Sequence, residues 1–123
     1  MTGSDFIRFS AKKIKIDDEG KKKIIGLPIG WEKITETSIQ EGHKVLCVRT
    51  GKLNNITVVD FDSVKAYDKA IVKFPELKEF FTIKTPRGYH IYSKYNECIK
   101  TTTDKKLKID IRNDGAFVFG SGS

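Results

Sequence analysis

The feature that most constrains the fold is the run Ile56-Thr57-Val58-Val59-Asp60-Phe61-Asp62, which is rich in β-branched residues until it meets two aspartates. β-branched residues favour a strand, and the side chains of a strand alternate between its two faces. Val58, Asp60 and Asp62 therefore share one face. At a rise of about 3.3 Å per residue, the Cα atoms of the two aspartates lie about 6 to 7 Å apart. Both carboxylates can then reach one hard divalent cation.

The same aspartates also have a purely structural interpretation. Acidic residues suit a turn and the positive end of a helix dipole, and a helix is expected directly after Asp62. That interpretation explains one aspartate better than two. Two carboxylates at the end of a buried apolar strand lower stability unless a cation or hydrogen-bond donors compensate them. We therefore interpret Asp60 and Asp62 as metal ligands.

A third acidic candidate lies in residues 107–112, where the alternation also predicts a strand. Its apolar positions are expected in the core, and its polar positions on the opposite face. The expected core residues are Leu107, Ile109 and Ile111, and the polar ones are Lys108, Asp110 and Arg112. Asp110 is thus a third candidate ligand. Arg112 either holds a phosphate oxygen with its planar guanidinium group or forms a structural ion pair with Asp110.

A histidine candidate follows from residues 85–92, which begin as a turn and continue as a strand. Alternation puts Gly88, His90 and Tyr92 on one face of that strand. A lone histidine beside aromatic residues is more often structural than functional, so His90 needs support from its surroundings. His43 has no such surroundings and is assigned no role.

The rest of the chain predicts one domain, spanning residues 1–123, of the α+β or α/β class with one sheet. Residues 1–26 are weakly specified. Residues 45–48 form a buried apolar strand that ends at Thr50 and Gly51 and pairs with residues 56–62 as a hairpin. Ser63 caps a helix, which Pro75 ends. The apolar stripe of that helix is Val64, Tyr67, Ile71 and Phe74. The single tryptophan, Trp31, is expected to pack at the edge of the core.

Charge and composition indicate which classes of binding partner and which cellular environment to expect. The chain has 23 Lys and Arg against 16 Asp and Glu, a net charge of +7, which favours polyanions such as nucleic acid. Lys21, Lys22 and Lys23 either contact nucleic acid or form a solvated face. The two cysteines lie far apart, without the spacing of a zinc site, so we expect no zinc and a reducing, intracellular environment. No apolar run approaches the about 18 to 20 residues that span a bilayer, so a soluble protein is expected.

Three motifs now occur in a recognisable order: Asp-x-Asp after an apolar strand (Asp60, Asp62), Gly-x-His in a turn and strand (Gly88, His90), and an aspartate in a further apolar strand (Asp110). They resemble the motifs of the archaeo-eukaryotic primase superfamily, and most of all the N-terminal domain of bifunctional DNA primase/polymerases, the prim-pol family. The flanking residues that add to the resemblance are Thr50, Gly51, Thr85, Pro86, Arg87, Ile111, Arg112 and Gly115. The chain departs from that family at Gly88, where serine is frequent.

The resemblance implies an RRM-like mixed or antiparallel sheet with helices on one face, beside a small N-terminal α/β unit. It implies that Asp60, Asp62 and Asp110 hold two Mg²⁺ or Mn²⁺ ions and that His90 contacts the incoming nucleoside triphosphate. The candidates for nucleotide or phosphate contact are Arg87, Lys108, Arg112, Thr50 and Gly51. Together these residues would catalyse template-directed nucleotidyl transfer.

The same resemblance implies the partners. They are a single-stranded DNA template, nucleoside triphosphates, and a superfamily 3 helicase domain on the same or another chain. Lys21 to Lys23 would add salt-sensitive template binding. The expected location is an intracellular site of DNA replication, such as that of a viral or plasmid replicon. The family usually continues beyond residues 116–119, so the chain resembles an isolated or truncated catalytic domain.

Two alternatives stay open on the residues alone. A metal-dependent nuclease or phosphoesterase would use the same carboxylates to hydrolyse a phosphodiester. A noncatalytic nucleic-acid-binding module on an RRM-like sheet would depend on exposed aromatic residues rather than on aspartates.

Overall fold

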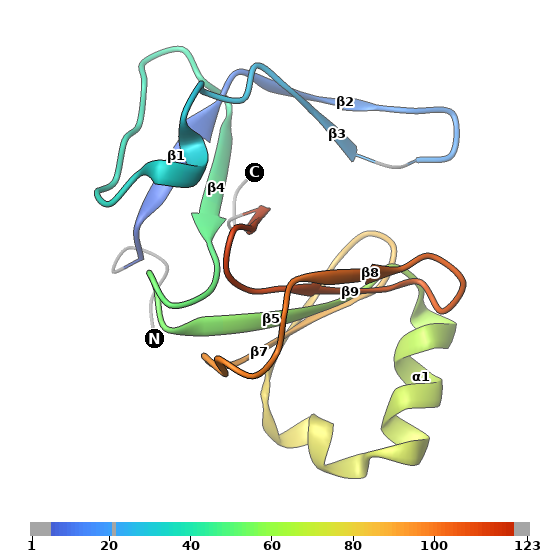
Figure 1. The fold of residues 1–123 in the computed structure, drawn as a ribbon. Coiled ribbons are helices and arrows are strands. Elements are labelled where there is room, and N and C mark those ends of the chain that lie inside the picture. Colours follow the sequence, from blue (N-terminus) through green and yellow to red (C-terminus); the bar gives the residue numbers. More distant parts are fainter. Residues whose placement is uncertain (1–5, 21, 120–123) are drawn as a thin grey trace. The chain divides into compact units, whose positions relative to one another are not determined.

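The computed structural model describes residues 6–20 and 22–119, which belong to two compact units (Figure 1). One unit consists of the residues up to Arg49 and those from Phe117 onward, and the other is Thr50–Ala116. Strands dominate both units, and the described residues include one α-helix, so the α+β class is confirmed. Within those residues, no helix combines the length and apolar character needed to cross a membrane.

The first unit is built from two antiparallel sheets. The strand order of the larger sheet is β1-β4-β10, and β2 pairs with β3 in the smaller one. The bounds are β1 Arg8–Ala11, β2 Lys13–Ile16, β3 Lys22–Ile25, β4 Val45–Arg49 and β10 Phe117–Phe119. Phe9 is buried in the core, and Trp31 stacks on it with ring centroids 5.6 Å apart. The expected core packing of Trp31 is therefore confirmed.

The resemblance implied a small N-terminal α/β unit, and for the described residues this expectation is wrong. The part of this unit that the structure describes holds strands and a 3₁₀ helix, η2 (Trp31–Lys33), but no α-helix. Residues 27–44, which join the strands, contain Pro28, Gly30 and Gly42, and such residues interrupt a helical pattern.

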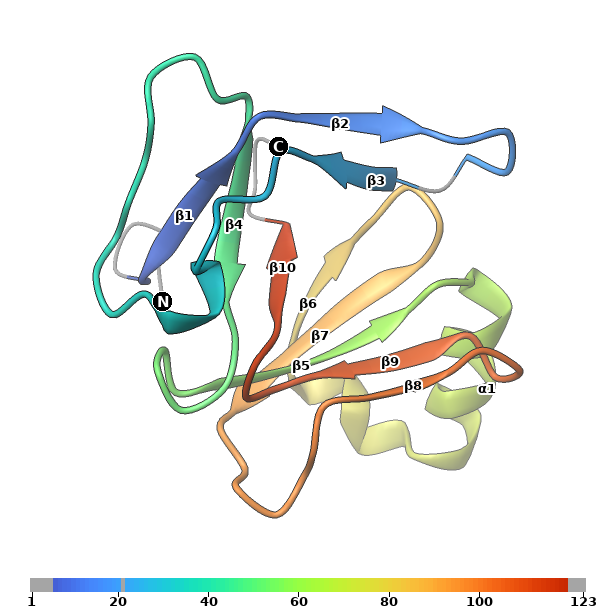
Figure 2. The same ribbon diagram turned by 45° about the horizontal axis from the view of Figure 1, so that its top comes forward.

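The second unit is a five-stranded antiparallel sheet with α1 on one side (Figures 1 and 2). The strand order is β6-β7-β5-β9-β8, so β5 lies at the centre and β6 and β8 form the edges. The bounds are β5 Ile56–Phe61, α1 Val64–Lys73, the 3₁₀ helix η3 Pro75–Glu79, β6 Phe81–Lys84, β7 Tyr89–Lys94, β8 Thr102–Asp104 and β9 Ile109–Arg112. All strand pairs of this sheet are antiparallel, in agreement with the expected mixed or antiparallel sheet.

Helix α1 begins and ends where the sequence predicts. The Ser63 hydroxyl accepts a hydrogen bond from the Ala66 N–H at 3.1 Å and so caps the first turn. Tyr67 packs against Phe61 of β5 and Tyr89 of β7, with ring centroids 5.6 and 4.1 Å away. These contacts fix α1 over the sheet face that carries Phe61 and Tyr89.

Replacing Ser63 with alanine is expected to lower the free energy of unfolding by about 1 kcal/mol, because the Ala66 N–H loses its capping acceptor. Ser63→Asp should retain the stability, since aspartate also caps. Urea denaturation of the three proteins measures the difference. Equal midpoints for wild type and Ser63→Ala would show that the cap contributes nothing.

The expected hairpin between residues 45–48 and 56–62 is wrong, and so is the single sheet. β4 pairs with β1 and β10, whereas β5 lies in the five-stranded sheet. Gly51 has a φ of 88°, and it bridges back to Ile56 at the start of β5. A Cβ at Gly51 would lie 2.5 Å from the Asp114 Oδ1, so the tight turn requires glycine. This turn leads the chain out of one sheet and into another.

The expected strand over residues 107–112 is two residues shorter in the structure. β9 begins at Ile109, because Lys108 has a φ of 59° and belongs to the preceding turn. Leu107 is 59% exposed, so its expected burial in the core is wrong. Its N–H donates to the Asp104 carboxylate at 2.9 Å, which closes the turn between β8 and β9. Turn chemistry therefore overrides the alternation here.

Asn113, directly after β9, is fully buried and connects three segments of the second unit. The Thr57 hydroxyl donates to its Oδ1 at 2.8 Å, and its Nδ2 donates to the carbonyls of Asn96 and Ile99 at 2.9 and 2.5 Å. Its own carbonyl accepts from the Thr50 hydroxyl at 2.6 Å. Buried polar groups need such partners, so Asn113 holds the loop before β8 against the sheet.

Candidate functional site

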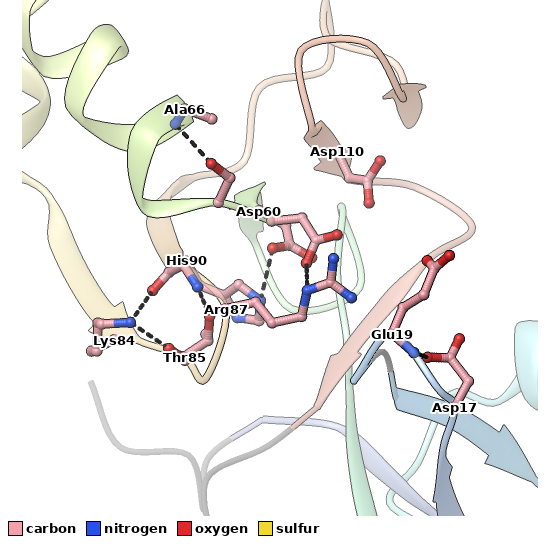
Figure 3. Close-up of polar contacts among 12 residues, drawn as sticks. Asp17, Glu19, Asp60, Ala66, Lys84, Thr85, Arg87, His90 and Asp110 are labelled. Carbon is pink, nitrogen blue, oxygen red and sulfur yellow. Dashed lines mark hydrogen bonds and ion pairs between the residues drawn. The ribbon is translucent and has the colours of Figure 1, made fainter.

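A row of polar side chains crosses the centre of the five-stranded sheet. The register places Asp60 of β5 directly opposite His90 of β7 on one side and opposite Asp110 of β9 on the other. Directly opposite residues of antiparallel strands share one face. Figure 3 shows Asp60, His90 and Arg87 close together, with Asp110 on the neighbouring strand. The residues that the sequence marked separately therefore meet on one face.

The hydrogen-bond phase of β5 explains the spacing within this row. The Asp62 N–H donates to the carbonyl of Lys108, its opposite residue, at 2.9 Å. Hydrogen-bonded pairs recur every second residue, so Asp60 and Asp110 also form a hydrogen-bonded pair, with Cα atoms about 5.5 Å apart. On its other side Asp60 forms a non-hydrogen-bonded pair with His90, with Cα atoms about 4.5 Å apart. The His90 Nε2 accordingly lies 3.3 Å from the Asp60 Oδ1.

Asp62 extends the row beyond the end of β5 and contacts the turn before β7. The Arg87 Nε lies 3.2 Å from the Asp62 Oδ1. The Gly88 N–H donates to the Thr85 hydroxyl, which shapes this turn. A Cβ at Gly88 would overlap the Phe61 carbonyl oxygen, so no other residue fits without moving the backbone. This contact accounts for the glycine at position 88.

Asp110 and Arg112 form an ion pair on β9, with the Arg112 Nη2 at 3.1 Å from the Asp110 Oδ2. Of the two roles open for Arg112 in the sequence, the structure shows this ion pair. Lys108 does not share the face by strand alternation, since it lies in the turn with a positive φ, although its carbonyl receives the Asp62 N–H.

Each of the three aspartates thus has a basic partner of its own: His90 for Asp60, Arg87 for Asp62 and Arg112 for Asp110. In the part of the chain that the structure describes, no group of three or more His, Cys, Asp or Glu side chains is gathered closely enough to hold a metal ion. The carboxylates are partly exposed, from 21% for Asp110 to 34% for Asp62. The row therefore combines acidic groups with basic groups that lie beside them.

Other candidates lie away from this row. Thr50 is buried with its hydroxyl bonded to Asn113, and Gly51 bridges Ile56 at the opposite end of β5. Ile56 and Asp60 are four residues apart, so about 13 Å of strand separates Gly51 from the row.

The basic segment belongs to the first unit. Lys21 lies outside the described residues, while Lys22 and Lys23 are in β3. The Lys22 ammonium lies 5.5 Å from the Phe119 ring centroid, which is a cation–π contact.

Two aromatic residues beside the row were assigned no role from the sequence. Tyr92 follows His90 on the same face of β7, and Phe81 of β6 lies directly opposite it. Burial, and to a smaller extent the nearby Asp60 carboxylate, raises the pKa of Tyr92 to about 12. The Tyr92 hydroxyl is therefore neutral at physiological pH. Strand phase marks Tyr92 in the sequence, but only the pairing of β6 with β7 identifies Phe81.

The fold and the row define an antiparallel sheet with a cluster of paired charged residues on one face, in which aspartates, a histidine and two arginines come from three adjacent strands and a turn. The chain matches none of the protein-family models and none of the curated protein sequences with which it was compared.

Proposed function

We propose that this chain catalyses template-directed nucleotidyl transfer, as in prim-pol enzymes, with Asp60, Asp62, Asp110 and His90 as its catalytic residues. The observation that supports this proposal best is the register. Asp60 from the first motif is opposite His90 from the second and Asp110 from the third. If the three short motifs occurred together only by chance, there would be no reason for their polar residues to lie side by side on adjacent strands.

The order of the strands also supports an RRM-like sheet. β5, α1, β6, β7 and β9 follow one another in the chain, and the strand order in the sheet is β6-β7-β5-β9. RRM-like and ferredoxin-like sheets follow a β-α-β-β-α-β pattern in which the first and third strands are central neighbours. In this chain the position of the second helix is taken by the loop that contains β8.

The chemistry of the three carboxylates supports a hard divalent cation, which would have to draw them away from their present basic partners. Carboxylate oxygens are the ligands that Mg²⁺ and Mn²⁺ prefer, and Asp60 and Asp110 lie directly opposite each other on adjacent strands. Asp60, Asp62 and Asp110 would hold the metal. A bound divalent cation would lower the pKa of an attacking hydroxyl and neutralise charge on the triphosphate.

The basic residues would then serve the phosphates. Arg87 and Arg112 are held next to the carboxylates by single contacts of 3.2 and 3.1 Å, and the Arg87 Nη1 has no hydrogen-bond partner among the described residues. With the aspartates engaged by a cation, both guanidinium groups would be available to bind phosphate oxygens. His90, anchored beside Asp60, would orient the triphosphate, and charge that builds up during transfer would be stabilised by these fixed donors.

The proposal predicts that the protein incorporates labelled nucleoside triphosphates on a single-stranded DNA template with Mg²⁺ or Mn²⁺. The double substitution Asp60→Ala and Asp62→Ala should abolish the incorporation, because it removes two of the three metal ligands. Gel analysis of the extended products measures it. Unchanged incorporation by the double variant would refute the site.

The same assay without triphosphates separates the alternatives. Cleavage of the DNA would identify a nuclease, and DNA binding without either reaction would identify a binding module.

A further inference from the structure

An exposed aromatic ring stands beside the polar row. Phe81, the first residue of edge strand β6, is 64% exposed and lies directly opposite Tyr92. The two rings meet edge to face, with centroids 5.9 Å apart and planes at 65°. The ring therefore presents most of its apolar surface on the same face as the polar row.

Phe81 is held in place although it is exposed. Tyr92 supports it from one side, and the Tyr92 ring in turn lies 6.3 Å from the His90 ring. The chain of contacts therefore runs from Asp60 through His90 and Tyr92 to Phe81. A ring that is already ordered loses little entropy when a flat ligand stacks on it.

The position of this aromatic pair matches the dimensions of a nucleotide. Tyr92 is two residues beyond His90, which corresponds to about 7 Å along β7, and Phe81 is one strand further toward the open edge. The phosphates of a nucleotide and its base are separated by a similar distance. A triphosphate held by Arg87 and His90 would therefore extend its base toward Phe81.

We propose that Phe81 stacks against the base of the incoming nucleoside triphosphate and that Tyr92 is the residue that positions it. The inference rests on the proposed function, because the phosphate-binding row defines the end of the ligand. Aromatic stacking accepts every base, since each base has a π-face. Such a contact suits an enzyme in which the template, and not the protein, selects the base.

The test compares two ligands of the full chain by titration calorimetry in the presence of Mn²⁺: ATP and inorganic tripolyphosphate. Phe81→Ala should weaken ATP binding by about 10-fold or more and leave tripolyphosphate binding unchanged. Phe81→Trp should retain ATP binding. Phe80→Ala is the matched control, because Phe80 is the adjacent phenylalanine, is 44% exposed and precedes β6. Its ATP affinity should equal that of the wild type.

The outcomes separate this inference from the proposed function. If Phe81→Ala binds ATP as tightly as the wild type, or loses ATP and tripolyphosphate equally, the stacking role is refuted. A loss of affinity for single-stranded DNA alone would also refute it, in favour of a template contact. If ATP binding depends on Phe81 but no nucleotide is incorporated, the stacking role stands and nucleotidyl transfer fails. If neither ATP nor tripolyphosphate binds to the wild type, both proposals fail.

Discussion

Replacing Asp110 with asparagine is expected to reduce nucleotide incorporation by at least about 1,000-fold, because a carboxylate ligand contributes several kcal/mol to charge stabilisation by a bound metal. The free energy of unfolding should change by less than about 1 kcal/mol. Two small effects oppose each other. The substitution removes the partly exposed ion pair with Arg112, and it relieves the repulsion from Asp60 on the neighbouring strand. Activity and stability should therefore separate in this variant.

Single-turnover primer extension and urea denaturation of the same preparation test this separation. Asp104→Asn is the matched control, because Asp104 lies on the adjacent strand β8 and an asparagine oxygen can still accept the Leu107 N–H. Its incorporation rate should be that of the wild type. If Asp110→Asn retains more than about a tenth of the activity, a loss below about 1.4 kcal/mol, Asp110 is not a metal ligand.

Replacing Asn113 with alanine is expected to lower the free energy of unfolding by about 3 to 5 kcal/mol. The substitution leaves the Thr57 hydroxyl without its acceptor and the carbonyls of Asn96 and Ile99 without their donor, at a residue that is 0% exposed. The Thr57 hydroxyl is buried, and a buried polar group that loses its partner costs about 1 to 3 kcal/mol; the two part-buried hydrogen bonds to the carbonyls and the lost packing add to this. The loss should appear as a large shift in the urea midpoint.

Asn113→Asp distinguishes hydrogen bonding from packing, because it retains the shape of the side chain. Its second oxygen would face the Asn96 and Ile99 carbonyls, which need a donor, so it should be at least as destabilising as alanine. The exposed Lys106→Ala should stay within about 0.5 kcal/mol of the wild type. A stable Asn113→Asp protein would show that the polar contacts of Asn113 are not important for the fold.

The two predictions address neighbouring parts of one strand. Asp110 lies within β9, and Asn113 follows directly after its end. Asn113 links the central strand to the segment that leaves β7, since Thr57 is in β5 and Asn96 follows the end of β7. These are the strands that carry Asp60 and His90, so the buried asparagine helps to keep the row in register.

Local patterns in the sequence were sufficient for the elements that a single segment specifies. The β-branched run with its two aspartates predicts β5, and Ser63 with its apolar stripe predicts α1 and its cap. Strand alternation also puts His90 on the polar face of β7. These predictions hold because backbone geometry determines which side chains of one element share a face.

Local patterns were insufficient wherever a turn or a distant strand decided the outcome. Lys108 adopts a positive φ and shortens β9, which exposes Leu107. β4 pairs with β1 and β10, from opposite ends of the chain, and not with the neighbouring β5. The period of a pattern carries no information about which strand will supply the partner, since pairing depends on contacts between distant segments.

By itself, then, the sequence determined that Asp60, Asp62, His90 and Asp110 are polar residues of strands or strand ends, on faces set by alternation. Only the tertiary structure decided that Asp60 is opposite both His90 and Asp110, that Arg87 reaches Asp62, and that Phe81 stands beside Tyr92. The physical reason is that alternation fixes the face of a side chain, whereas its neighbours across the sheet follow from register. Register depends on turns such as the one at Gly88, which fits against the Phe61 backbone only because it has no side chain.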